Sequence, residues 1–207
     1  MLDVRELGTL QLDALREVAS IGSGHAATAL SQLTGRRIWV NAPEIQIVPV
    51  EEVGSLTGSE DEIVACVVMQ VLGDLAGRTI QVFPAPTASR LAGILLRRND
   101  VQFPDGFGDV EKSALKEAGN IIGAAYLNAL SDFLGMMILT SVPGLAIDQA
   151  GAVLTSGSIM ETDHGDHLIC IETTFRMDEE RQALKGHFLL VPDPDSLQVI
   201  LRAIRLA

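Results

Sequence analysis

Basic side chains are scarce in this chain of 207 residues. Fifteen lysines and arginines are outnumbered by 27 aspartates and glutamates, which gives a formal net charge of −12. The longest basic runs are two arginine pairs, Arg36-Arg37 and Arg97-Arg98. A surface with this excess of negative charge repels a phosphate backbone, so we expect no nucleic-acid partner.

Long apolar runs are also absent. Nowhere do about 18 apolar residues follow one another, as a membrane-spanning helix requires. The first residues, MLDVRELGTLQ, lack the basic segment and the apolar run of a secretory signal. With 47% hydrophobic and 20% charged residues, the composition is typical of a folded domain. We therefore expect a soluble, cytoplasmic protein without membrane insertion.

Cysteine is nearly absent. Cys66 and Cys170 each lie inside an apolar, β-type run, and no C-x-x-C pair occurs. This usage predicts two buried thiols rather than a disulfide, a metal site or a nucleophile.

One glycine motif raises the question of a bound nucleotide. Gly22, Gly24 and Ala27 have the spacing G-x-G-x-x-A, which in a dinucleotide-binding loop follows a strand and opens a helix. Here a helical pattern of apolar residues continues on both sides of the glycines. Because each mid-helix glycine costs about 1 kcal/mol relative to alanine, we interpret them as sites where a neighbouring element packs closely against a helix.

An internal repeat organises the chain. Residues 12–45 align with residues 112–145 at an offset of 100 without a gap, and ten of the 34 aligned pairs are identical. Such a match indicates a duplication, which changes how each local motif is interpreted.

Each half has the same order of predicted elements. A long amphipathic helix, at about 10–33 or 110–134, is followed by a helix-terminating glycine, strand-like runs and a shorter helix. The strand-like runs cover residues 37–50, 62–71, 77–85, 136–147, 167–177 and 184–192, and the closing helices cover 87–98 and 195–207. We predict one α+β domain over residues 1–207, with antiparallel strands and pseudo-twofold symmetry. Its two repeats are expected at approximately 8–97 and 110–207, joined by a linker at 98–109.

A polar trio repeats on the two long helices. Ser113, Glu117 and Asn120 are spaced i, i+4 and i+7, which places them on one helix face. The equivalent residues of the first copy are Asp13, Glu17 and Ser20.

This trio resembles the signature of the CheC, CheX and FliY phosphatases of chemotaxis, and CheC most closely. That signature is Asp or Ser, three residues, Glu, two residues, Asn, then 22 residues and Pro. The second copy matches throughout and includes Pro143. The first copy has Pro43 in place but departs from the signature at Ser20, where the family has Asn.

The resemblance implies an enzyme that hydrolyses the aspartyl phosphate of a CheY-type response regulator. It implies that Asn120 orients the attacking water and that Glu117 pairs with a lysine of the receiver, so both are the expected catalytic residues. Ser113 and Asp13 would support docking. No cofactor of its own is expected, since the receiver supplies Mg²⁺.

The first site is expected to be weak or inactive. The side chain of Ser20 is shorter than that of Asn and lacks a planar amide, so it cannot reach equally far into a partner's pocket. Docking of a receiver through Glu17 would remain.

A second class of function stays open, namely an adaptor with little or no turnover. CheC-like proteins also bind CheD, the receptor deamidase, and Asp148 matches a contact position of the family. A flagellar switch component of the FliY type is disfavoured, because the chain ends soon after the last predicted helix.

Two further polar features receive ordinary structural interpretations. Asp163, His164, Asp166 and His167 lie in a short polar segment before a strand, which is more typical of a hydrated turn than of a metal site. His25, on the first long helix, is expected to be a packing or surface residue.

Overall fold

The computed structural model describes residues 7–41, 43–98, 107–154, 167–177 and 184–206. Its helices are α1 (Thr9–Thr34), the 3-10 helix η2 (Val50–Ser55), α2 (Ala85–Leu95), α3 (Asp109–Leu134), α4 (Ala150–Leu154) and α6 (Pro194–Leu206). Its strands are β1 (Ile38–Val40), β2 (Glu44–Pro49), β3 (Ile63–Gly73), β4 (Gly77–Pro84), β5 (Ile138–Thr140), β6 (Gly144–Gln149), β7 (His167–Met177) and β8 (Leu184–Pro192). None of the described helices combines the length and the apolar character that crossing a bilayer needs.

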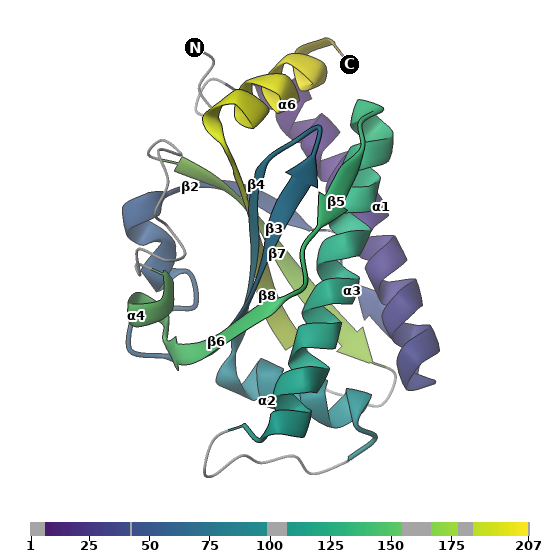
Figure 1. The fold of residues 1–207 in the computed structure, drawn as a ribbon, viewed down its shortest axis with the longest axis vertical. Coiled ribbons are helices and arrows are strands. Elements are labelled where there is room, and N and C mark those ends of the chain that lie inside the picture. Colours follow the sequence, from purple (N-terminus) through teal and green to yellow (C-terminus); the bar gives the residue numbers. More distant parts are fainter. Residues whose placement is uncertain (1–6, 42, 99–106, 155–166, 178–183, 207) are drawn as a thin grey trace.

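The two long helices, α1 and α3, lie side by side and run in opposite directions (Figure 1). Each ends at a glycine in the left-handed conformation, Gly35 with φ 69° and Gly135 with φ 65°. The glycine N–H donates to the carbonyl of Ser31 or Ser131, which satisfies a carbonyl that the helix end would leave unpaired. Both helices begin and end within one residue of their predicted bounds, which confirms the prediction.

The eight strands found among the described residues form one antiparallel sheet, six of them in the order β1-β7-β8-β4-β3-β5. Strand β2 continues the edge beside β7, and β6 continues the opposite edge beside β3. The repeats thus exchange their first strands, since β1 and β2 of one half pair with β7 of the other and β5 and β6 pair with β3. Strands β4 and β8 meet at the centre, where Gln81 is the register partner of Phe188. The α+β, pseudo-twofold, antiparallel fold is confirmed.

The first strand-like run of each half was predicted as continuous, and this was wrong. In the structure it splits into β1 and β2, or β5 and β6, so each half contributes four strands rather than three. Pro43 and Pro143 lie at the breaks, where a residue without a backbone N–H cannot extend the hydrogen-bonded ladder. The short helices η2 and α4 were also not expected. Of the proposed linker, residues 99–106 lie outside the described residues.

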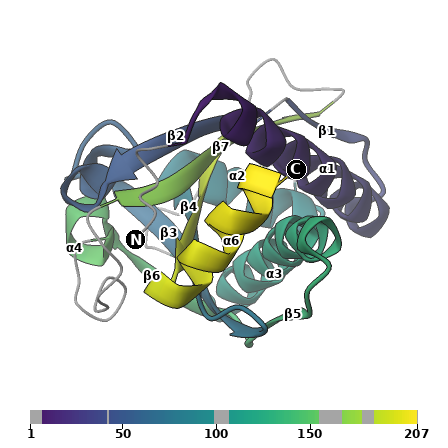
Figure 2. The same cartoon turned by 90° about the horizontal axis from the view of Figure 1, so that it is seen from above.

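Helices lie on both faces of the sheet (Figures 1 and 2), and an apolar core lies on each side of it. The larger core lies between the sheet and the helices α1 and α3, while a smaller one lies beneath η2 and α4 on the opposite face. Helix α2 packs against α3, and α6 packs against α1, so each long helix has one short helix near its first turns. The outer faces of α1 and α3 remain exposed beside each other.

Candidate functional site

The second polar trio lies on the exposed face of α3. Ser113 and Glu117 are exposed and Asn120 is half-buried, whereas Leu115 and Ala118 of the same helix are fully buried. Residues at i, i+4 and i+7 lie on one face of a helix, so the polar trio is on the outer face while the apolar residues are on the inner one. Among the described residues, the side chains of Glu117 and Asn120 have no hydrogen-bond or ion-pair partner. A carboxylate and a carboxamide are thus available, one turn apart, to an external ligand.

An ion pair fixes the start of α3 near this trio. Glu111, in the first turn, is only 9% exposed, and its Oε1 accepts a hydrogen bond of 2.6 Å from Nη1 of Arg98. The backbone N–H of Arg98 in turn donates to the carbonyl of Gly93 in α2 at 2.8 Å. The Glu111 side chain is largely shielded from water but that of Arg98 is 56% exposed, so the pair contributes modestly to stability while it links the first turn of α3 to the segment after α2.

An open groove of about 510 Å³ adjoins Ser113 and Glu117. Its apolar lining comes from three helices that meet there: Leu33 of α1, Leu95 at the end of α2 with the following Leu96, and Val110 and Ala114 of α3. Asp109, Ser113 and Glu117 supply the polar lining. Since Leu33 is 45% exposed and Val110 is 54% exposed, a partner that docks on the trio can also bury apolar surface here.

The first trio lies toward the other end of the helix pair, because α1 and α3 are antiparallel. Asp13, Glu17 and Ser20 are all exposed on α1. Oδ1 of Asp13 accepts a hydrogen bond of 2.6 Å from Nη1 of Arg16 on the same helix. Both side chains of that pair are about half exposed, so the pair stabilises the helix weakly. The structure does not bring the two trios together.

Asp148 lies on β6, at the sheet edge, and not on the helix face. Its backbone is the register partner of Val64 in β3, and its side chain is exposed. Oδ1 accepts a hydrogen bond from the backbone N–H of the next residue, Gln149, at 2.8 Å. Any partner of Asp148 would therefore contact a different surface from a partner of the trios.

The remaining sequence candidates have structural roles or fall outside the description. Gly22 and Gly24 lie within the continuous helix α1, so they form no phosphate-binding turn. Cys66 and Cys170 are free and buried, and burial raises the pKa of each thiol to about 12. His25 is exposed on α1. Asp163, His164 and Asp166 lie outside the described residues, and His167 is the first residue of β7.

Sequence reasoning missed the apolar groove and the Arg98–Glu111 pair. Both depend on how α2 is placed against α3, and no local pattern specifies that placement. In the sequence, only the apolar pair Leu95-Leu96 directly before the basic pair Arg97-Arg98 could have indicated this surface.

Taken together, the fold and the sites define a class of protein: an internally duplicated α+β domain that presents one polar motif on each of two antiparallel helices. The model of the CheC-like family matches residues 10–47 and 110–147, which have the same offset as the repeat. The CheY-P phosphatase CheC of Bacillus subtilis strain 168 is 33% identical over 195 residues, covering 94% of this chain and 93% of that protein. This chain belongs to the CheC-like family.

Further comparisons agree with this assignment. A CheC1 protein of Halobacterium salinarum is 25% identical over 204 residues, covering 99% of this chain and 98% of its own. Among solved structures, FliY of Thermotoga maritima matches with a TM-score of 0.80 and 20% identity, covering 97% of this chain and 98% of that chain. At that identity the likeness establishes the shared fold.

Proposed function

We propose that this protein is a phosphatase that hydrolyses the aspartyl phosphate of a CheY-type response regulator, mainly through the motif on α3. The observation that carries the proposal is the pair of unpartnered side chains, Glu117 and Asn120, one turn apart on the outer face of α3. The relative from Bacillus subtilis, named a CheY-P phosphatase, supports the reaction.

The main task of the phosphatase in this reaction is to position the attacking water relative to the receiver's phosphoryl group. An acyl phosphate is hydrolysed by in-line attack of water, and the receiver's own Mg²⁺ and lysine neutralise the phosphoryl oxygens. The Asn120 amide offers an acceptor and donors in one plane, so it can hold the attacking water in line with the phosphorus. Asn120 is half-buried, which restricts its side chain and lowers the entropy lost when it enters the receiver's pocket.

Glu117 and the groove would set the docking position. The Glu117 carboxylate is free to accept a charge-assisted hydrogen bond from the receiver's lysine. The groove beside it, lined by Leu33, Leu96 and Val110, would take an apolar part of the receiver surface. Charge pairing then selects the orientation and apolar burial adds affinity.

The test is loss of phosphate from a phosphorylated receiver in the presence of Mg²⁺. Asn120→Ala is expected to lower kcat by about 100-fold or more, because the water loses its orienting group. Ser20→Ala is expected to leave the rate nearly unchanged. Asn128→Ala is the matched control, because Asn128 is an exposed asparagine on the same helix outside the trio. Full activity of Asn120→Ala would refute the proposal.

An adaptor role toward CheD is the second candidate. It is favoured by the exposure of Asp148 on the edge strand β6, where a partner can approach side chain and backbone together. Titration with CheD, with and without phosphorylated receiver, tests it. Tight CheD binding that Asp148→Lys abolishes, together with little or no phosphatase turnover by the wild-type protein, would favour the adaptor over the enzyme.

A further inference from the structure

Helix α3 contacts the sheet through two glycines that flank Asn120. A Cβ atom built on Gly119 would lie 2.5 Å from Cγ1 of Val67 and 2.8 Å from Oε1 of Gln81. A Cβ atom on Gly123 would meet Cε of Met69 and would lie 2.7 Å from Nε2 of Gln81. Alanine at 119 would meet Cβ of Val67, which cannot move without its strand, so glycine permits this close approach. Alanine at 123 would require the ends of the Met69 and Gln81 side chains to shift. We call Val67, Met69 and Gln81 the shelf.

Gln81 is an unexpected residue for this place. It is 1% exposed, and neither its Oε1 nor its Nε2 has a hydrogen-bond partner within the part of the chain that the structure describes. A buried polar group left without a partner costs about 1–3 kcal/mol, and an apolar side chain of similar shape avoids that cost. Fold stability alone therefore does not account for glutamine here. Its amide spans the distance between Gly119 and Gly123, beneath the helical turn that presents Asn120.

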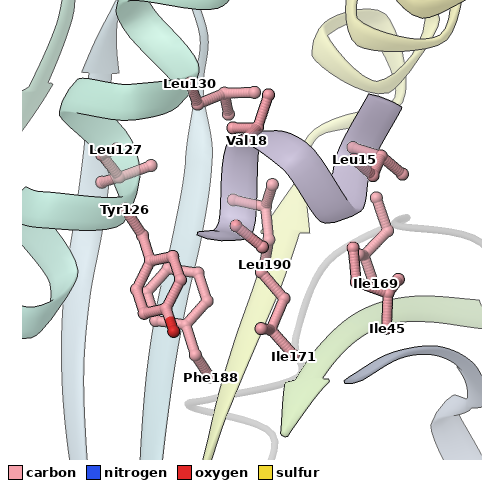
Figure 3. Close-up of a pocket in the computed structure, with 11 residues that line it drawn as sticks. Leu15, Val18, Ile45, Tyr126, Leu127, Leu130, Ile169, Ile171, Phe188 and Leu190 are labelled. Carbon is pink, nitrogen blue, oxygen red and sulfur yellow. The ribbon is translucent and has the colours of Figure 1, made fainter. Parts of the chain in front are cut away.

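The helix with the degenerate motif lacks this arrangement. Ala19 and Ser23 stand in α1 where Gly119 and Gly123 stand in α3, and Phe188 stands across the central strand pair from Gln81. An apolar cavity of about 30 Å³ lies between α1, α3 and the sheet, and its lining includes Val18 of α1, Tyr126 of α3 and Phe188 (Figure 3). The ring of Phe188 lies 4.7 Å from that of Tyr126, centroid to centroid. Thus a polar side chain lies against α3 at its motif, whereas Phe188, at the equivalent place in β8, is apolar and lines a cavity shared by both helices.

We propose that Gln81 is a positioning residue for Asn120: its planar amide, wedged beneath Gly119 and Gly123, fixes the height and rotation of the turn that carries Asn120. The inference rests on the phosphatase function proposed above. In-line attack requires the water to be held within a fraction of an ångström, and a displacement of about 1 Å can cost 100-fold in rate. The shelf is thus part of what distinguishes the active half from the degenerate one.

The first test replaces Gln81 by methionine, which has similar length but a flexible end and no amide. The midpoint of thermal unfolding is expected to stay the same or rise, because an unpaired buried amide is removed. The kcat for receiver dephosphorylation is expected to fall about tenfold, with KM within about twofold of wild type. If Gln81 had a purely structural role, kcat would fall only together with the midpoint of thermal unfolding. A kcat within about twofold of wild type overturns the proposal.

The second test uses Gly119→Ala, which is expected to move α3 away from the shelf. It tests the proposal independently if Gln81→Met fails to fold. We expect the same fall in kcat with an unchanged KM. Gly24→Ala is the matched control on α1, because outside its own helical turn no described atom lies within 4 Å of a Cβ placed there. Undiminished kcat of folded Gly119→Ala overturns the proposal.

Asn120→Ala is measured in parallel to separate the two proposals. If this variant keeps full activity, the phosphatase function itself is refuted. If it is inactive while Gln81→Met is active, only the role of Gln81 is refuted.

Discussion

Gly22 of α1 lies directly against Tyr126 of α3. A Cβ atom on this glycine would come within 2.7 Å of Cδ1 and 2.9 Å of Cα of the tyrosine. The Tyr126 hydroxyl is 2.8 Å from the hydroxyls of both Ser23 and Thr173, so it links the two helices to strand β7. The first glycine of the apparent nucleotide motif therefore permits the two long helices to cross.

This crossing predicts opposite effects of alanine at two neighbouring glycines. Gly22→Ala is expected to lower the free energy of unfolding by about 2 kcal/mol, because backbone atoms of Tyr126 must move. Gly24→Ala is expected to raise it by up to about 1 kcal/mol through helix propensity, since its Cβ meets nothing. Urea unfolding of the two variants gives both values. Equal effects would contradict the close contact.

The apolar groove predicts an effect on binding rather than on turnover. Val110→Glu places a charge in the groove, and we expect KM for the phosphorylated receiver to rise about tenfold with little change in kcat. The second position of a helix accepts glutamate well, so α3 should remain intact. The control is Leu10→Glu, at the same position of α1, where Leu10 is 82% exposed. A KM equal for both variants would remove the groove from the docking surface.

Restoring asparagine to the first trio is expected to be insufficient for full activity. In an Asn120→Ala background, Ser20→Asn should recover less than about a tenth of the wild-type rate, because α1 lacks a shelf beneath its motif. Adding Ala19→Gly should allow α1 to approach the sheet and increase the recovered rate. Full recovery from Ser20→Asn alone would show that placement of α1 already suits catalysis.

His187 predicts a loss of stability at mildly acidic pH. Burial lowers the pKa of this imidazole and Lys185 lowers it further, while Glu172 and Glu62 oppose the shift. In the unfolded chain the imidazole takes up a proton near pH 6.5, which the folded state resists. The free energy of unfolding should therefore fall as the pH drops below about 6.5, and the loss should be complete once the pH passes the lowered pKa.

A comparison of wild type with His187→Leu isolates this contribution. Chemical unfolding at a series of pH values between about 8 and 5.5 should give a shallower pH dependence for the variant. Identical slopes would mean that protonation of His187 is not coupled to folding. Carboxylates contribute to both curves and cancel in the difference.

Helical periodicity and terminal glycines were sufficient to predict α1 and α3, since both signals are local. Strand partners were not predictable, because each half carries the same pattern whether it pairs within itself or with the other half. The burial of Gln81 was not predictable for a related reason. The alternation in GRTIQVFP assigns Thr79 and Gln81 to solvent, but both are at most 1% exposed, because β4 is central and covered on both faces.

The trio on α3 was predictable because its spacing specifies a single helix face. The surface around it was not, since the groove combines Leu33, Leu96 and Val110 from parts of the chain that only tertiary packing brings together.

The exchange of first strands between the repeats also bears on how the protein is synthesised. Strands β1 and β2 emerge early from the ribosome, yet their hydrogen-bonding partner β7 begins only at His167. The nascent first half therefore holds unpaired strand edges until most of the chain has been made, and the sheet closes late through contacts distant in sequence. A messenger truncated after the first repeat would yield a chain in which β1 and β2 lack β7, their native partner.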